Sequence, residues 1–331
     1  MISVSKMKLS SEMQEQLSCP ACKSSLEPAE DKLHCLNADC GRTFPIVDGI
    51  PVLINDDKSL FSIEDVLRES KTSVSRPAKS TMRKFAAKLV PSISSNVNAD
   101  RNYESFGKAL LAMADSPRVL VVGSGLLGAG IEKLLALSSR IEVVESDIGV
   151  RPRVAVVCDA HDIPFNEKVF DGVVVQAVLE HVADPHRCVE EIHRILKTGG
   201  IVYAETPFIQ QVHGGPYDFC RFTHLGHRRL FRKFDEVESG VACGPGMALA
   251  WSYLYFLLSF ARSSFSRRLL QTFGRFTSFY LTYFDRFLIG RAGTFDAASG
   301  FYFIGRKTGK TLSDKELVQL YRGAIPVSMR H

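Results

Sequence analysis

The stretch that most constrains this chain is the glycine-rich turn inside Val119–Gly130. Its four apolar opening residues are typical of a buried parallel strand, and an apolar helix is expected over Ile131–Leu137. Gly123, Gly125 and Gly128 separate these elements, because a Cβ would block the tight turn and keep the backbone from approaching a ligand. The spacing predicts a nucleotide site, but it fits dinucleotide enzymes, methyltransferases and plain strand-turn-helix connections alike.

Bulk composition narrows the class of protein. With 331 residues, 45% of them hydrophobic, the chain can bury a full core and suggests about two domains. A net charge of +5 does not by itself indicate a nucleic-acid binder. Residues 1–17 lack the apolar core of a secretory signal, so we expect a cytoplasmic protein whose eight cysteines are reduced.

Four of these cysteines are spaced as metal ligands. Cys19 and Cys22 form one close pair, and Cys35 and Cys40 form a second. Two short knuckles of this kind supply four tetrahedral thiolate ligands to zinc. A redox pair is the alternative, but the motif lacks a βαβ setting and so short a segment could hardly fold without a metal.

The residues after the cysteines are typical of a strand, a tight turn and a second strand: Phe44-Pro-Ile-Val-Asp-Gly-Ile-Pro-Val-Leu. With the Cys-Pro-x-Cys knuckle they resemble the zinc-ribbon family that activates tRNA and release-factor methyltransferases, over roughly residues 17–55. We therefore expect a zinc-ribbon domain at 1–56. A Ser-, Lys- and Arg-rich linker is expected at 57–100, and the apolar face of 101–114 is expected to pack on the next domain.

A second strand, Arg140–Asp147, ends in acids 22 and 24 residues beyond Gly123. A carboxylate at such a strand tip can accept hydrogen bonds from both ribose hydroxyls of an adenosine. Asp147 is preferred over Glu145 for this role, because Ile148-Gly149 is typical of the turn that leaves such a strand. The remaining acid is then a solvated strand end.

Two later motifs identify the nucleotide. Asp159-Ala-His-Asp-Ile-Pro-Phe follows a third strand, and Leu179-Glu-His-Val follows a fourth that begins at Phe170-Asp171. In this order the motifs resemble those of class I S-adenosylmethionine-dependent methyltransferases, from Val119 to about Lys307. The resemblance implies S-adenosylmethionine bound by Gly123, Ser124, Gly125, Gly128, Asp147, Asp159, Ala160, Gln176 and Ala177.

Within that set the resemblance assigns Asp159 and Ala160 to the adenine edge and Gln176–Val178 to the methionine part. One departure concerns Val121, where the family often has an acid. The methionine ammonium then needs another partner, for which backbone carbonyls near Gly123 or Ala177 are candidates.

Alternating strands and helices continue to residue 307 and predict an α/β fold. We expect a Rossmann-like seven-stranded sheet with helices on both faces, over residues 101–310. A helical aromatic insertion, at about 245–295, is expected before the last strand, and residues 311–331 form a C-terminal tail.

The loop at 210–229 follows the fifth strand and is dense in polar and aromatic residues, so it is expected over the methyl acceptor. His213, Tyr217 and Arg221 are the candidate acceptor-side residues there, and His181 is a fourth candidate near the sulfonium. The alternative is a loop held by an Asp218–Arg221 pair, with His224 and His227 on a solvated helix face and His181 structural.

The insertion has two unlike parts. Met247–Ala261 carries no charge, and Arg262–Arg291 carries six arginines against one acid, Asp285. Fifteen uncharged residues are short for a membrane span, which needs about 20. A hairpin lying at a membrane surface, a homodimer contact or a lid over the core therefore remains open for 247–291.

We expect a methyltransferase that O- or N-methylates a glycan, a lipid-linked or another small polar acceptor. The run Pro-Tyr-Asp-Phe-x-Arg-Phe-Thr and the aromatic hairpin are similar to methyltransferases of bacterial surface-polysaccharide pathways. Cytoplasmic localisation follows, with peripheral contact at the inner face of the membrane left open. The alternatives are a methyltransferase of tRNA or a translation protein with the ribbon as built-in activator, and a catalytically silent scaffold. Nucleic acid is the weaker partner, because the ribbon has no long basic patch.

Overall fold

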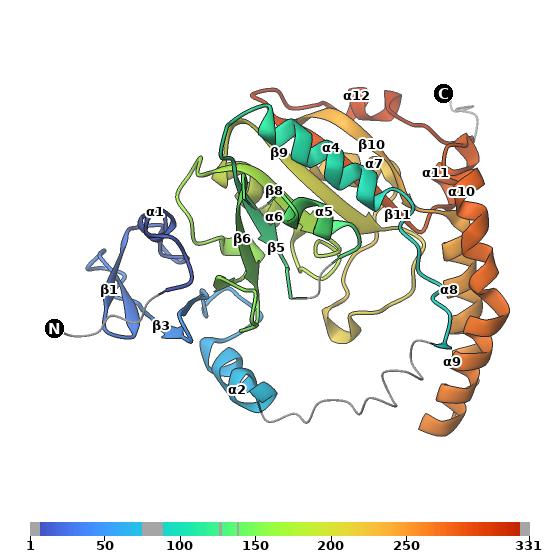
Figure 1. Cartoon of the computed structure of the whole chain (residues 1–331), viewed down its shortest axis with the longest axis horizontal. Coiled ribbons are helices and arrows are strands. Elements are labelled where there is room, and N and C mark those ends of the chain that lie inside the picture. The colour runs from blue at the N-terminus through green and yellow to red at the C-terminus, as the bar shows by residue number, and fades with distance from the viewer. Residues whose placement is uncertain (1–6, 75–88, 126–127, 138, 325–331) are drawn as a thin grey trace.

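The computed structural model describes residues 7–74, 89–125, 128–137 and 139–324. Within them eleven strands form one sheet in the order β1-β2-β3-β4-β7-β6-β5-β8-β9-β11-β10 (Figure 1). The strands are β1 (Leu26–Ala29), β2 (Lys32–Cys35), β3 (Thr43–Val47), β4 (Ile50–Leu53), β5 (Arg118–Val122), β6 (Glu142–Asp147), β7 (Val156–Cys158), β8 (Phe170–Gln176), β9 (Leu196–Pro207), β10 (Phe234–Cys243) and β11 (Gly300–Lys307).

The helices lie between and beyond these strands. They are α1 (Ser11–Glu15), α2 (Ile63–Val74), α4 (Ala99–Leu111), α5 (Ile131–Leu135), α6 (Pro185–Ile195), α7 (His224–Leu230), α8 (Pro245–Leu258), α9 (Ser264–Ser278), α10 (Asp285–Leu288), α11 (Ala292–Ala297) and α12 (Asp314–Gln319). Short 3₁₀ helices are η1 (Ala160–Asp162), η2 (Gly215–Tyr217) and η3 (Phe279–Phe284).

Seven of the strands, β5 to β11, form the predicted methyltransferase sheet. Strands β7, β6, β5, β8 and β9 run parallel, whereas β11 is antiparallel to both β9 and β10. The apolar runs are buried on both faces, as parallel sheets require. Leu120 and Val122 face one core, and Val119 and Val121 face the other.

Helices cover both faces, as predicted. The core that contains α4 and α5 uses Tyr103, Phe106 and Leu110, which are fully buried. Residues of α6 and of the end of α7 belong to the opposite core, in which Ile192 and Phe231 are fully buried. The expectation that the apolar face of 101–114 packs on the next domain is confirmed.

The sheet as a whole has more strands than the seven predicted, because the four strands of the ribbon extend it. Strand β4 pairs in parallel with β7, with Val52 opposite Val157 and Leu53 opposite Cys158. An uncovered β7 would leave a row of unpaired backbone groups at the sheet edge, and β4 satisfies them. The ribbon also shares one apolar core with η1 and α6, through Leu17 and Phe165.

The predicted linker, 57–100, is not wholly irregular. Helix α2 lies in it, and its first turn carries Glu64 and Asp65, which favour a helix start. Residues 75–88 of that linker lie outside the described residues, as do 1–6 of the ribbon domain, 126–127 of the glycine-rich turn and 325–331 of the tail. The domain limits stay predictions.

The insertion forms a helical hairpin of α8 and α9 at the β10 end of the sheet, opposite the ribbon (Figure 1). Several of its aromatic side chains are exposed, with Phe265 at 76% and Phe287 at 75%. Its one acid, Asp285, is buried and accepts hydrogen bonds from the N–H groups of Gly246 and Met247. Among the described residues no helix combines the length and apolar character needed to cross a bilayer.

Candidate active site and zinc centre

The four cysteines of the ribbon converge on one point. The Sγ atoms of Cys19 and Cys40 are 3.8 Å apart and those of Cys22 and Cys35 are 3.4 Å apart, and all four lie within 4.8 Å of one another. Tetrahedral zinc with Zn–S bonds of about 2.3 Å separates its sulfurs by about 3.8 Å. The cluster therefore fits zinc.

Two similar turns bring the thiols together. The N–H of Lys23 donates to the carbonyl of Cys19 at 2.8 Å, and the N–H of Gly41 donates to the carbonyl of Asn37 at 3.0 Å. Lys23 and Gly41 both adopt positive φ, 61° and 55°. The wider spacing between the last two cysteines thus still forms a knuckle, because its turn begins at Asn37.

The glycine loop and Asp147 hold each other at the ends of β5 and β6. The Asp147 carboxylate accepts hydrogen bonds from the N–H groups of Gly125, at 2.8 Å, and Gly149, at 3.1 Å. A Cβ on Gly125 would lie 2.6 Å from that carboxylate, and one on Gly123, at φ 74°, would lie 2.4 Å from Val178. Glycine at these two positions lets the loop approach both side chains, and the positive φ of Gly123 also favours glycine.

The second acid of β6 has a different role. Glu145 is buried and forms an ion pair with Arg153. It is a structural residue, although not the solvated strand end that the sequence suggested. Between the glycines, Ser124 is also buried, and its hydroxyl has no hydrogen-bond partner among the described residues. This orphaned hydroxyl fits a site that a ligand completes.

Asp159 lies at the end of β7 with Ala160 beside it, and both are buried. Its Oδ2 accepts a hydrogen bond of 2.5 Å from the hydroxyl of Ser59, in the segment that leaves the ribbon. Its Oδ1 accepts from the N–H of His161 at 2.9 Å. Burial raises the pKa of Asp159, but the hydrogen bonds from His161 and Ser59 outweigh it and hold the pKa below its usual range.

Strand β8 ends in a strained turn. Ala177 has φ 54°, in the left-handed region that side chains other than glycine rarely adopt, and such strain gathers at functional sites. A Cβ on Gly128 would lie 1.8 Å from Oε1 of Gln176, so this glycine lets the turn approach the strand end. The predicted cofactor residues thus lie at the carboxyl ends of four neighbouring strands, β7, β6, β5 and β8.

Glu205 is a residue that sequence reasoning missed. It ends the apolar run of β9 and is buried, and it accepts hydrogen bonds from Gln176 at 2.7 Å, from Asn96 at 2.9 Å and from Tyr203. Burial raises its pKa, and the three side chains that donate to it are uncharged. An acid at the end of an apolar strand was the available signal.

Hydrogen bonds hold the loop 210–229 against the residues that follow β8. The N–H groups of Phe219 and Cys220 donate to the carbonyl of Glu180 at 2.8 and 3.2 Å. Nδ1 of His181 lies 2.7 Å from the carbonyl oxygen of Tyr217. The Tyr217 ring contacts Phe61, with centroids 5.2 Å apart, so the segment leaving the ribbon also contacts this loop.

Arg221 and His213 have different surroundings. The Arg221 guanidinium donates to the Asp218 carboxylate and to the carbonyls of Gln210 and Gln211. These contacts match the alternative of a structural Asp218–Arg221 pair. His213 instead faces Glu180, and that carboxylate raises the pKa of His213 above its usual value.

The alternative was wrong about His224 and His227, which are not on a solvated face. Both are buried, and their rings pack against Phe301 and Phe231 respectively. Burial lowers the pKa of His224 to about 4 and that of His227 to about 3. Helix α7 packs its histidine face onto β11. Its seven residues are mostly polar, so the sequence does not indicate that this face is buried.

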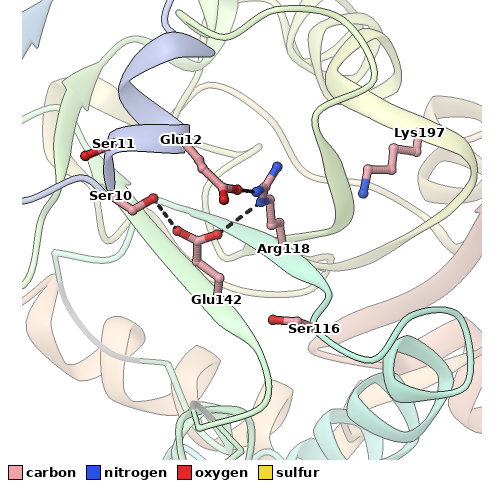
Figure 2. Close-up of a pocket in the computed structure, with 7 residues that line it drawn as sticks. All are labelled: Ser10, Ser11, Glu12, Ser116, Arg118, Glu142 and Lys197. Carbon is pink, nitrogen blue, oxygen red and sulfur yellow. Dashed lines mark hydrogen bonds and ion pairs between the residues drawn. The ribbon is translucent and has the colours of Figure 1, made fainter.

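A separate pocket lies at the amino ends of β5 and β6, away from the strand ends described above (Figure 2). There the Arg118 side chain contacts both Glu12 of α1 and Glu142, and the Ser10 hydroxyl donates to Glu142 at 2.6 Å. Polar contacts between the ribbon and the sheet thus line this pocket.

Comparison with known proteins agrees with this architecture. The family described as "Methyltransferase domain" matches residues 122–204, and "Trm112p-like protein" matches residues 13–49. The UPF0434 protein of Ectopseudomonas mendocina is 35% identical over 51 residues, which are 15% of this chain and 84% of that protein. Its Stutzerimonas stutzeri counterpart is 37% identical over the same shares.

Solved structures resemble the chain at low sequence identity. A Haloferax volcanii complex of the Trm112 methyltransferase activator with a methyltransferase has a TM-score of 0.39 at 17% identity, covering 65% of this chain and 92% of that one. Phosphoethanolamine N-methyltransferase 2 of Haemonchus contortus has a TM-score of 0.39 at 16% sequence identity. The match covers 63% of this chain and 53% of that one. The chain therefore combines a class I S-adenosylmethionine-dependent methyltransferase domain with an N-terminal Trm112-like domain whose four cysteines fit zinc.

Proposed function

We propose that this protein transfers the methyl group of S-adenosylmethionine to a hydroxyl or amine of a glycan or lipid-linked acceptor held under the loop 210–229. The observation that carries this proposal is the fastening of that loop to Glu180 and His181, directly after the strained end of β8. Donor and acceptor would then meet at the carboxyl edge of the sheet. Because the sulfonium is already activated, the chain mainly has to align the two and exclude water.

In this proposal Asp147 accepts hydrogen bonds from the ribose, and Asp159 and Ala160 lie at the adenine edge. The methionine part lies over Gly123–Gly125 and the turn at Gln176 and Ala177. Because Val121 carries no acid, Glu205, which is hydrogen-bonded to Gln176, is the candidate partner for the methionine ammonium. S-adenosylmethionine contributes the electrophilic methyl group.

Cofactor binding is tested by calorimetry on the full chain. Asp147→Ala is expected to weaken S-adenosylmethionine binding by about 10- to 100-fold, since charge-assisted hydrogen bonds contribute about 1.5–3 kcal/mol. Glu145→Gln is the matched control, because it changes the neighbouring acid on the same strand. Equal affinity of Asp147→Ala and the unaltered chain would contradict the proposed ribose contact.

The acceptor class is tested with labelled cofactor. Methyl transfer into a cell lysate, followed by separation into glycolipid, RNA, protein and small-molecule fractions, should label the glycolipid fraction. Label in RNA together with steep salt dependence of tRNA binding would favour the tRNA alternative. No release of S-adenosylhomocysteine under any of these conditions would favour the silent scaffold.

A lipid-linked acceptor is supported by the α8–α9 hairpin. Residues 245–291 contain six arginines and one acid, Asp285, and that acid is buried. The exposed surface of the hairpin therefore combines cations with aromatic rings. Such a face suits an anionic membrane surface. Sedimentation with vesicles should retain the protein on anionic lipid and lose it on zwitterionic lipid. A concentration-dependent dimer without vesicle binding would favour the homodimer instead.

A second role, built-in activation by the ribbon, is favoured by the pairing of β4 with β7 and by the Ser59–Asp159 hydrogen bond. Through these contacts the ribbon would stabilise the adenine side of the cofactor site. Arg118→Ala is the matched control for variants of that segment, because it removes contacts with Glu12 of α1 and with Glu142 at the opposite end of the strands.

A further inference from the structure

Three side chains that could ligate a metal converge beside the proposed methyl-transfer site. The ligand atoms of Glu180, His181 and His213 lie within 4.8 Å of one another. Oε1 of Glu180 is 3.9 Å from Nε2 of His181 and 3.8 Å from Nε2 of His213. Both distances exceed hydrogen-bond length, yet they are shorter than about 4.2 Å, twice a metal–nitrogen bond. A single cation can therefore contact all three side chains after small shifts.

Glu180 is unusual for a buried acid. The residue is 1% exposed, and neither carboxylate oxygen has a hydrogen-bond partner among the described residues. Buried charges are ordinarily paired or bound to metals, because an isolated one is expensive to remove from water. The carboxylate is thus directed at the two histidines without being satisfied by them.

The histidine tautomers strengthen this point. Nδ1 of His181 is 2.7 Å from the carbonyl oxygen of Tyr217, and Nδ1 of His213 is 3.2 Å from that of Gln211. Carbonyl oxygens only accept, so each Nδ1 carries the hydrogen, and each ring in its neutral form presents the Nε2 lone pair toward Glu180. Backbone carbonyls commonly orient metal-bound histidines in this way.

The loop geometry keeps His213 in place. The Asp218 carboxylate accepts hydrogen bonds from the N–H groups of His213, at 2.7 Å, and Gly214, at 3.1 Å, and Arg221 holds that carboxylate. A Cβ on Gly214 would lie 2.5 Å from the His181 ring. The two rings are therefore positioned by the loop backbone against the end of β8.

We propose that Glu180, His181 and His213 bind one divalent transition-metal ion. Two imidazoles and one carboxylate suit Mn²⁺, Fe²⁺, Co²⁺ or Zn²⁺, whereas Mg²⁺ and Ca²⁺ prefer oxygen ligands alone. Three protein ligands leave coordination positions open, as in catalytic sites. The His181 and His213 side chains are 28% and 26% exposed, so the open side faces solvent and the acceptor.

The role of this ion rests on the proposed function. It would bind the acceptor hydroxyl and lower its pKa, so that the proton leaves to solvent. The acceptor oxygen then forms a bond to the methyl carbon as the carbon–sulfur bond breaks, and the electron pair stays on sulfur. The products are the methyl ether, S-adenosylhomocysteine and one proton.

The test uses the full chain with its ribbon already loaded with zinc. Mn²⁺ is titrated with detection by electron paramagnetic resonance, and Co²⁺ is titrated with detection by visible absorption. Mn²⁺ binds N, O and S ligands more weakly than Zn²⁺ and so will not displace it from the thiolates. We expect one saturable Mn²⁺ or Co²⁺ per chain, lost in Glu180→Gln and in His213→Ala. His186→Ala, which changes an exposed histidine of α6, should keep it.

Absence of saturable Mn²⁺ and Co²⁺ binding in the unaltered, folded chain overturns the proposal whatever the variants do. Binding that persists in both Glu180→Gln and His213→Ala overturns it as well, because the ion then lies elsewhere. Calorimetric S-adenosylmethionine binding is measured on the same samples. Metal binding without cofactor binding would contradict the proposed function alone, and cofactor binding without metal would contradict this inference alone.

Discussion

The two ligand clusters of this chain differ in the way that structural and catalytic metal sites differ. The cysteine cluster offers four identical soft ligands on two knuckles and holds together a small ribbon. The cluster of Glu180, His181 and His213 offers three mixed ligands at the end of a buried strand, and two of them are partly exposed. A full ligand set closes a site around its ion, whereas an incomplete one leaves room for a substrate. We therefore expect changes in the cysteine cluster to lower stability, and changes in the Glu180 cluster to lower activity.

The largest effect is expected from opening the cysteine cluster. Cys22→Ser combined with Cys35→Ser should unfold the ribbon, because structural zinc contributes on the order of 10 kcal/mol to small domains. Limited proteolysis should then cleave within residues 7–55, and S-adenosylmethionine binding should weaken. Cys220→Ser, outside the cluster, is the control. An unchanged proteolysis pattern would mean that the ribbon folds without its metal.

The next largest effect is a loss of activity with little change in stability. Gly214→Ala places a Cβ 2.5 Å from the His181 ring, so the loop must shift. A misplacement of about 1 Å lowers methyl transfer by as much as 10²-fold, with little change in the unfolding temperature. Gly290→Ala, where a Cβ meets nothing within 4 Å, should leave both unaltered. Parallel losses of stability and rate in Gly214→Ala would remove the distinction between the clusters.

Histidines without a carboxylate beside them provide a third comparison. Burial lowers the pKa of His227 to about 3, below its unfolded value of about 6.5. The unfolded chain therefore binds more protons between these values, and stability is present above about pH 6.5 and is lost as the pH falls toward 3. His227→Leu should flatten the fall in unfolding temperature between pH 7 and 5, whereas His186→Leu should not. Identical pH profiles would show that other groups govern acid unfolding.

The smallest effect links the ribbon to the cofactor. Ser59→Ala removes a hydrogen bond to Asp159 and should weaken S-adenosylmethionine binding by about 3- to 10-fold, as expected for roughly 1 kcal/mol. Ser10→Ala removes a similar hydrogen bond between the ribbon and Glu142 at the opposite end of the strands (Figure 2). Its cofactor affinity should not change. Equal losses in both variants would attribute the effect to general loosening of the ribbon.

Short-range spacing accounts for what the sequence predicted well. The zinc ligands lie on two knuckles of a few residues each, and the glycine loop and its strand are contiguous, so local rules suffice. The seven-stranded sheet with helices on both faces also follows from the resemblance to a known fold. Chemistry that depends on neighbouring residues can thus be predicted from the order of the amino acids alone.

Contacts between distant segments were not visible in the same way. Glu180 belongs to a motif after the fourth strand, but its distance to His213 depends on the path of the chain through 33 further residues. Likewise β4 and β7 pair across a separation of about a hundred residues, and no local pattern encodes that register. His224 and His227 lie in a short, mostly polar helix. Their burial results from packing against β11, which is distant in the sequence.

The pairing of β4 with β7 also bears on solubility. Without the ribbon, the apolar strand Val156–Cys158 would be the outer edge of the catalytic sheet, ready to pair with another chain. In the intact protein the outer edge on this side is β1, a strand of four residues that contains Glu27 and Pro28. A charge and a missing backbone donor make that edge a poor template for further strands. Removing the N-terminal domain should therefore make the protein more prone to self-association, independently of any effect on catalysis.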